Sequence, residues 1–336
     1  ENMACLYVTE QGSSLTVSGG KIVVKCKSGL ERLLPLEIVE SIMIFGTVLM
    51  TTQAIKVCLE KKISVTFLST KGGYFGRLES TTGYHGERLK KQVYLSDDPQ
   101  SCLEFSGKVL KAKVHNQLIL LRRYARSHGG NIEAEAENVF QCEKKIETSQ
   151  NIQEVMGYEG MAAREYFKAL SKLVVPEFAF NGRTKRPPKD PFNAMLSLGY
   201  TILFYEIYAE LETRSLMPYI GFIHKLKAQH PALVSDLLEE WRAVIVDAVV
   251  MSLVQGREIS TDMFSQDLES GAVLLSNAGV KILVEKLEKK MRSDMHYLSY
   301  LDRPVSFRRA IWHQVKRLAA CIDAKSFADY TPIKIR

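Results

Sequence analysis

The sequence predicts an α+β fold, with a small β-rich N-terminal domain followed by a larger, mostly α-helical C-terminal domain. Short runs of β-branched and aromatic residues, separated by glycines, fill residues 3 to about 80, and this pattern is typical of strands. From residue 88 onward, apolar residues recur every three or four positions, which indicates amphipathic helices. A polar stretch with two glycines separates these patterns at 81–87, so we expect domains at 1–84 and 85–336.

The composition is that of a soluble globular protein large enough to bury a sizeable core. The chain has 336 residues, of which 46% are hydrophobic and 25% are charged. Its six cysteines are scattered without a C-x-x-C pair, so we expect mostly buried, free thiols in a reducing compartment. No apolar run approaches a membrane span and no secretory signal is evident, so we expect a cytoplasmic protein without membrane contact. The net charge of +7 is compatible with a polyanionic partner.

The N-terminal domain is expected to contain short strands arranged in two layers or a roll. Ser18–Gly20 lies between two β-type runs and is a hairpin signal. One helical pattern interrupts the strands at Thr52–Lys61, with Thr51 or Thr52 as the candidate N-cap. The strands are expected at residues 5–9, 14–17, 21–25, 33–36, 42–45, 64–68 and 74–80.

The C-terminal domain is expected to be a series of helices joined by polar, glycine- or proline-containing loops. The helices are expected at residues 88–95, 103–126, 152–173, 194–212, 231–254, 271–291 and 302–318. Loops are expected at residues 127–131, 178–193 and 256–264. The chain shows neither an internal repeat, nor a glycine-rich phosphate loop, nor the Cys/His spacing of a zinc site.

An acidic cluster lies on the helix expected to start with Pro231 in its first turn. Asp236, Glu239 and Glu240 fall off the apolar stripe and neighbour one another on the helix surface. His224 lies one short loop upstream, and an imidazole close to clustered carboxylates is a plausible site for a divalent cation. A solvated acidic face with an ordinary loop histidine explains the same pattern equally well. The stripe itself consists of Leu233, Leu237, Trp241, Val244 and Ala248.

A further carboxylate, Glu159, lies in the sequence Gly157–Gly160 near the expected start of a helical stretch. In the first turn it complements the helix dipole, which is a purely structural reason for its presence. The functional alternative is a metal ligand delivered from a rigid helix start.

Basic residues cluster in three places that suit a phosphate backbone. One cluster lies in a loop with three prolines, and the other two lie on the helices expected at 103–126 and 302–318. An ordinary surface loop and solvated helix faces are the alternative interpretations. The candidates for nucleic-acid binding are Arg183, Lys185, Arg186 and Lys189 in the loop, Lys108, Lys111, Lys113, Arg122, Arg123 and Arg126 on the first helix, Arg308, Arg309, Lys316 and Arg317 on the second, and Arg164 in the helix expected at 152–173.

Five stretches in one order carry a resemblance to a known family. They are PLEIVESIMIFGTVLMTTQAI, GYEGMAAREYF, RPPKDPFNAMLSLGY, PYIGFIH and DLLEEWR. Together they resemble the CRISPR-associated integrase of spacer acquisition, which is the first protein of the CRISPR adaptation pair. The resemblance runs from about Leu6 to Tyr330, which is essentially the whole chain.

The resemblance implies a metal-dependent DNA endonuclease and integrase that inserts short foreign DNA segments into a CRISPR repeat array during antiviral defence. It implies double-stranded DNA as substrate, magnesium or manganese as cofactor, and a homodimer whose interface lies largely on the β-rich domain, with the helical domain catalytic. It also implies a second partner, the small ferredoxin-like protein of the adaptation pair.

The resemblance also implies site residues. The glutamate of its G-Y-E-G box falls on Glu159, and the histidine of its G-F-x-H box falls on His224. The acidic pair of its D-L-x-E-E-x-R box falls on Asp236 and Glu239. We therefore expect all four to be catalytic, with Glu159, His224 and either Glu239 or Asp236 as metal ligands. The rival hypothesis is a non-catalytic DNA-binding adaptor whose acidic cluster is only structural.

Overall fold

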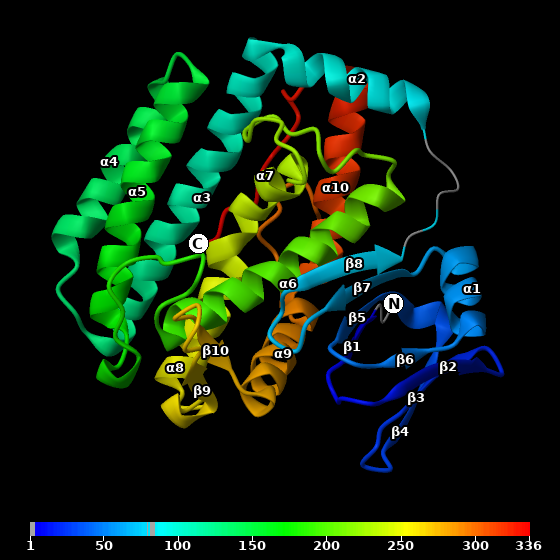
Figure 1. Ribbon diagram of the computed structural model, residues 1–336. Coiled ribbons are helices and arrows are strands. Elements are labelled where there is room, and N and C mark those ends of the chain that lie inside the picture. Colours follow the sequence, from blue (N-terminus) through cyan, green and yellow to red (C-terminus); the bar gives the residue numbers. More distant parts are fainter. Residues whose placement is uncertain (1–3, 79, 81–84) are drawn as a thin grey trace. The chain divides into compact units, whose positions relative to one another are not determined.

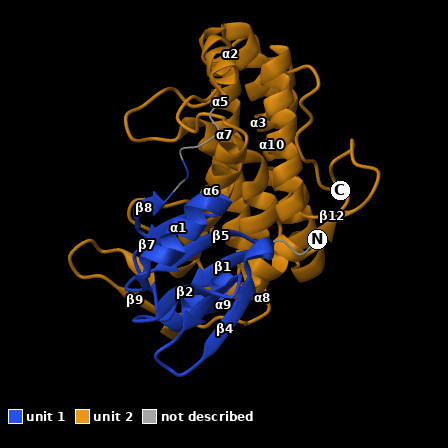
Figure 2. Cartoon of the chain, turned by 90° about the vertical axis from the view of Figure 1, so that its right-hand side faces the viewer, with its two compact units in different colours: residues 1–84, 275–284 blue, residues 85–274, 285–336 orange. Residues whose placement is uncertain are grey.

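The computed structural model describes residues 4–78, 80 and 85–336, and these form two compact units (Figure 2). Unit 1 comprises residues 1–84 and 275–284, and unit 2 comprises residues 85–274 and 285–336. The stretch in which we expected the domain boundary falls mostly on residues 81–84, outside the described residues. Segment 275–284, which lies within the expected range of the helical domain, belongs to unit 1.

Unit 1 contains two four-stranded sheets (Figure 1). One has the order β1-β5-β7-β8, in which β8 is antiparallel to β7 and the other pairs are parallel; the second has the order β4-β3-β2-β6. A single apolar core takes residues from both sheets and from helix α1, as Leu15, Ile42 and Cys58 illustrate. The bounds are β1 Ala4–Val8, β2 Ser14–Ser18, β3 Lys21–Lys25, β4 Glu31–Pro35, β5 Val39–Phe45, β6 Leu49–Met50, α1 Thr52–Lys61, β7 Ser64–Leu68 and β8 Tyr74–Leu78.

Local signals in unit 1 are confirmed. Ser18 pairs with Lys21 across a turn whose two glycines have φ of 54° and 73°, a backbone conformation that glycine adopts at little cost. Thr51 caps α1, because its hydroxyl accepts a hydrogen bond from the backbone N–H of Ala54 at 3.3 Å. The two-residue strand β6 was not predicted, since a run so short has no periodicity.

Unit 2 is mostly helical, which confirms the α+β fold class. Helices α3, α4 and α5 pack on one another, and α7 contacts both α3 and α6 (Figure 1). The bounds of its helices are α2 Gly86–Asp97, α3 Pro99–His128, α4 Glu133–Thr148, α5 Ile152–Leu173, α6 Pro191–Thr213, α7 Ala232–Trp241, α8 Ala248–Gln255 and α10 Phe307–Ala324, and α9, Asn277–Arg292, begins in unit 1 and ends in unit 2. None of the helices in the described residues is long and apolar enough to cross a membrane.

Three segments within residues 85–336 differ from expectation. Helix α4 was not predicted at all. The helix expected at 271–291 begins only at Asn277, because Val273–Leu275 forms strand β10 and pairs with β9, Phe264–Gln266. Helix α10 begins at Phe307, after β12, Val305–Ser306, which pairs with β11, Asp294–Met295.

The helix expected at 231–254 is interrupted. Pro231 is the residue before α7 rather than part of its first turn, and a π-helical segment, Arg242–Asp247, joins α7 to α8. Such a wide turn is often found at functional sites. It lies directly after the acidic cluster.

Candidate functional site

Helix α7 is buried on every side, and its acidic residues are therefore buried too. The exposed fractions of Asp236, Glu239 and Glu240 are 0%, 6% and 0%. The solvated acidic face that the sequence also allowed is wrong. A buried carboxylate needs hydrogen bonds or opposite charges to offset its lost hydration, and each of the three meets that need differently.

Asp236 holds the loop that carries His224. Its Oδ2 accepts hydrogen bonds from the backbone N–H groups of Phe222 and Ile223, at 2.6 and 3.0 Å. Its Oδ1 accepts one from the backbone N–H of His224 at 2.9 Å and lies 2.7 Å from the ring Nδ1 of the same residue. Burial opposes the protonated imidazole, but Asp236 outweighs it and raises the pKa of His224. Both oxygens of Asp236 are engaged in positioning.

Gly221 allows this close approach. A Cβ atom at Gly221 would lie 2.6 Å from Oδ2 of Asp236 and 2.9 Å from the backbone carbon of Ala232. Any side chain there would push the loop away from α7. The glycine of the sequence PYIGFIH is therefore required by packing.

Glu159 and Glu239 meet at one lysine. The Nζ of Lys113, on α3, lies 2.5 Å from Oε1 of Glu159, on α5, and 2.5 Å from Oε2 of Glu239. The Nε of Arg242 lies 3.2 Å from the same oxygen of Glu239. Lys113 is only 7% exposed, so in this structure it faces these carboxylates rather than the surface. We call Lys113, Glu159, Glu239 and Arg242 the ion-pair cluster.

Glu239 and Lys113 stabilise each other in their charged forms. Burial opposes ionisation of Glu239, but Arg242 and Lys113 lower the pKa of its carboxyl to about 2. Burial likewise opposes the ammonium of Lys113, but Glu239 and Glu159 hold its pKa above the ordinary value. Two carboxylates thus balance two cations.

Glu159 lies deeper in its helix than expected. Helix α5 begins at Ile152 and is capped by Asn151, so Glu159 is about two turns from the helix start. Interaction with the helix dipole falls off within the first turn, so it does not account for Glu159. Its side chain, 16% exposed, is directed to Lys113.

Glu240 has an entirely different environment. Its carboxylate accepts hydrogen bonds from the Tyr330 hydroxyl at 2.6 Å, from the Ile333 backbone N–H at 2.9 Å and from the Gln314 amide at 2.9 Å. Burial raises the pKa of Glu240 to about 7, and these hydrogen bonds only partly offset it. Glu240 therefore fastens the C-terminal segment to α7 and is not directed to the ion-pair cluster.

The structure thus brings the expected ligands together in two pairs. Glu159 and Glu239 converge on Lys113, whereas His224 is held by Asp236. Across residues 4–78, 80 and 85–336, no three His, Cys, Asp or Glu side chains already form a metal-binding group. The charge of Glu239 nevertheless acts on His224, so the two pairs are electrostatic neighbours.

Arg308 is not available to DNA, contrary to expectation. Its guanidinium Nη2 lies 3.1 Å from Oε1 of Glu206 and 2.7 Å from Oε2 of Glu288, and the residue is 6% exposed. These ion pairs tie α10 to α6 and α9. A buried guanidinium with two carboxylate partners contributes to packing rather than to DNA binding.

The basic residues of the proline-containing loop also differ in role: one is held by α6 and the others are exposed. Arg183 donates to Asn193 Oδ1 at 2.8 Å and to Ser197 Oγ at 3.0 Å, so it fixes the loop to α6. We expected Arg183 to bind DNA, but these contacts give it a structural role. Lys185, Arg186 and Lys189 are exposed. Partial burial of its ammonium, together with the charges of Arg242 and Lys113, lowers the pKa of Lys185. Lys185 is therefore within electrostatic range of the ion-pair cluster.

Among the other basic candidates, Arg122, Arg123 and Arg164 are exposed, whereas Arg309 is half-buried. Arg122 and Arg123 are exposed near the end of α3, and Arg123 donates to the backbone oxygen of Arg336 at 3.2 Å. Arg164 has a side chain that is 75% exposed and lies 3.6 Å from Glu165. The Arg309 guanidinium lies 3.7 Å from the ring centre of Trp312.

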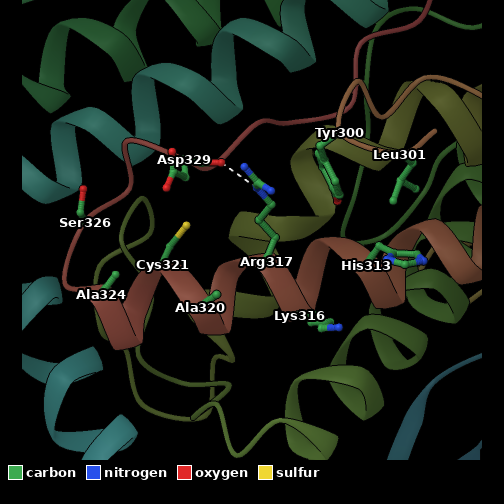
Figure 3. Close-up of a pocket in the computed structure, with 10 residues that line it drawn as sticks. All are labelled: Tyr300, Leu301, His313, Lys316, Arg317, Ala320, Cys321, Ala324, Ser326 and Asp329. Atoms are coloured by element: carbon green, nitrogen blue, oxygen red, sulfur yellow. Dashed lines mark hydrogen bonds between the residues drawn. The ribbon is translucent and has the colours of Figure 1, made fainter.

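A cavity of about 490 Å³ lies along α10, and none of the expected ligands lines it (Figure 3). Arg317 crosses it, donating from Nε to the backbone oxygen of Asp329 at 2.7 Å. The same guanidinium lies 4.5 Å from the ring centre of Tyr300. The candidate site is therefore the ion-pair cluster with its histidine rather than this cavity.

The sequence matches a known protein family over most of its length. The family model described as CRISPR associated protein Cas1 matches residues 6–289. A CRISPR-associated endonuclease Cas1 from Mycobacterium tuberculosis is 33% identical over 322 residues, which cover 96% of this chain and 95% of that protein.

Two solved structures share the fold. One is a Cas6-RT-Cas1–Cas2 complex, with a TM-score of 0.83 and 23% identity, in which the match covers 100% of this chain and 36% of that one. The other is a casposase bound to its integration product, with a TM-score of 0.82 and 21% identity over 99% of this chain and 96% of that one.

Proposed function

The chain belongs to the Cas1 family, and from that premise we propose that it cuts and joins DNA at a divalent metal ion held by Glu159, His224 and Glu239. It is a DNA endonuclease and integrase of CRISPR adaptation. The observation that carries the proposed site is the meeting of two carboxylates, from α5 and α7, at a single point. The alternative hypothesis of a non-catalytic adaptor is set aside, because a relative that this chain matches over 95% of the relative's length is named an endonuclease.

The chemical types of the three proposed ligands suit a divalent ion. Carboxylate oxygens with one imidazole are ligands that suit Mg²⁺ or Mn²⁺. Because Asp236 accepts from the ring at Nδ1, the lone pair of the neutral imidazole is at Nε2, the nitrogen left to bind a metal. Asp236, expected as an alternative ligand, instead positions His224.

The reaction transfers a phosphodiester bond. The nucleophile is a DNA 3′-hydroxyl in integration and water in cleavage; its oxygen bonds to phosphorus as the bond to the leaving DNA oxygen breaks. A divalent ion supplies a Lewis acid that activates the nucleophile and relieves charge on the leaving oxygen. Asp236 keeps the imidazole in one orientation, and Arg242 keeps Glu239 ionised. Lys185 and Arg186 hold neighbouring phosphates, since both are exposed on a loop close to the cluster.

Two protein partners complete the proposal. A homodimer forms through unit 1, which is supported by exposed apolar side chains on edge strands, with Leu33 57% exposed on β4, Leu49 67% on β6 and Phe75 70% on β8. Sedimentation at micromolar concentration should give a dimer, and the double variant Leu49→Lys, Phe75→Lys should give a monomer.

The small ferredoxin-like adaptation protein is the second partner, which is supported by a structural neighbour solved as a Cas6-RT-Cas1–Cas2 complex.

The function is tested with a labelled short duplex and a supercoiled plasmid that carries a repeat array. We expect strand-transfer product with Mn²⁺ or Mg²⁺ and none with a chelator. Glu159→Ala and His224→Ala should each lose the product and keep the helical circular dichroism of the wild type. Undiminished product from both variants would overturn the assignment of the site.

A further inference from the structure

Lys113 occupies the place where the proposed site would receive its cation. We propose that Lys113 is a built-in counterion of the metal site, which the divalent ion displaces and which then pairs with a DNA phosphate. Metal binding and DNA binding then strengthen each other. This inference rests on the proposed metal site and adds to it a regulating residue that belongs to none of the matched motifs.

The geometry leaves room for only one cation. The Lys113 nitrogen lies 2.5 Å from an oxygen of Glu159 and 2.5 Å from an oxygen of Glu239. A divalent ion bound by the same two oxygens would lie about 2.0–2.6 Å from each. An ammonium and a metal ion cannot both occupy that point, so one must leave when the other binds.

The backbone of Lys113 is fixed, but its side chain can move. Its neighbours Ala112 and Val114 are fully buried, and Asn116, one turn further, donates to the backbone oxygens of Glu240 and Ile333 at 3.3 and 3.0 Å. Helix α3 therefore stays in place. A lysine stem has four rotatable bonds and carries its charge as a compact point, so the ammonium can turn away without a change of fold.

Charge balance decides where the ammonium goes. The ion-pair cluster is neutral as it stands, with Glu159 and Glu239 against Lys113 and Arg242. A divalent ion adds two positive charges to a poorly solvated site, whose cations Arg242 and Lys113 already interact electrostatically with Lys185. Such an excess of like charge is costly at low effective dielectric. A DNA phosphate removes part of the excess and gives the released ammonium a partner.

The test is a measurement of Mn²⁺ binding rather than of activity. Isothermal titration calorimetry with the full chain compares wild type, Lys113→Met and Lys168→Met, each with and without a short DNA duplex. Lys168 is a matched control, because it lies on α5, the helix that carries Glu159, but pairs with Glu135 at 3.0 Å. In the wild type and the control, the duplex should tighten Mn²⁺ binding about tenfold.

Lys113→Met should bind Mn²⁺ about tenfold more tightly than the wild type without DNA, because the competing ammonium is gone. The duplex should then add less than about threefold. A merely structural Lys113 predicts the opposite sign, since its loss would disorder the carboxylates and weaken Mn²⁺ binding. Lys113→Gln, which keeps a donor to one carboxylate, replaces the methionine variant if that variant does not fold.

Each adverse result has its own meaning. Weaker or equal Mn²⁺ binding in the Lys113 variants, or an undiminished effect of the duplex on them, overturns the displacement but leaves the metal site standing. A duplex that leaves wild-type Mn²⁺ affinity unchanged overturns the displacement without any variant. Wild type that binds no Mn²⁺ in either condition overturns the proposed metal site, and the displacement with it.

Discussion

Glu239 and Glu240 are consecutive residues of one buried helix, yet they lie in opposite environments. Glu239 faces Lys113 and Arg242, which lower its pKa to about 2 against the effect of burial. Glu240 faces the neutral donors Tyr330, Gln314 and the backbone of Ile333, and burial raises its pKa to about 7. Successive side chains point about 100° apart around a helix, so adjacent acids reach different parts of the molecule.

The difference teaches how a buried carboxylate shows its role. The partners of Glu239 are the cations Lys113 and Arg242, and the lysine side chain is flexible enough to be replaced by another cation. Around Glu240, the carboxylate oxygens accept hydrogen bonds that close the C-terminal segment onto α7. We therefore assign Glu239 to the reaction and Glu240 to stability, and the following variants separate the two.

The largest expected effect is on Glu239. Glu239→Ala should lower the rate of strand transfer by about a thousandfold, since a metal centre supplies several kcal/mol of transition-state stabilisation. Initial rates per folded molecule, with folding followed by circular dichroism, provide the measurement. Glu240→Gln is the control and should stay within about threefold of wild type; equal losses in both would erase the distinction.

Glu240→Ala should affect stability instead. It leaves the Tyr330 hydroxyl and the Ile333 N–H without their acceptor and removes one acceptor of the Gln314 amide, which should cost about 3 kcal/mol of unfolding free energy. Denaturant unfolding at neutral pH measures the loss. Unchanged stability would show that the C-terminal segment does not depend on Glu240.

Asp236→Asn should have an intermediate effect on the reaction. The amide has one acceptor oxygen where the carboxylate uses two, so its NH2 group would face either the backbone N–H groups of Phe222 and Ile223 or the ring of His224. The imidazole then loses its fixed orientation. Loss of such an outer partner typically lowers metal affinity or activity by about 10–100-fold, to be measured as strand-transfer rate across Mn²⁺ concentrations. A loss as large as that of Glu239→Ala would instead mean that Asp236 is itself a ligand.

The smallest effect concerns the loop. Lys185→Ala with Arg186→Ala should flatten the slope of log affinity against log salt by about two on duplex DNA, at about 0.9 per phosphate contact. Binding isotherms at several salt concentrations on two unrelated duplexes test this, with Lys56→Ala in unit 1 as the control. A loss confined to one duplex would show that the loop reads bases.

Periodicity predicted most helices, because an apolar stripe records burial directly. It could not say which of three acids on α7 faces which neighbour, since Lys113, His224 and Tyr330 come from distant parts of the chain. One signal was present. Lys113 falls among the apolar residues of α3, and a cation in a buried stripe indicates a buried carboxylate partner.

Other features left no signal in the sequence. The partners of Arg308, which are Glu206 and Glu288, lie on two other helices, so a basic helix face could not be told from a buried ion pair. Strand β10 replaces the first residues of an expected helix because it pairs with β9, and such pairing lies outside local propensity.

The most direct test of the account compares the two neighbouring acids in a single binding measurement. Mn²⁺ is titrated calorimetrically into wild type, Glu239→Gln and Glu240→Gln with DNA duplex present. Each substitution keeps the shape of the side chain and removes its charge. We expect Glu239→Gln to weaken Mn²⁺ binding by more than about 100-fold and Glu240→Gln to change it by less than about twofold. Equal weakening in both variants, or none in Glu239→Gln, would contradict the division of roles on α7.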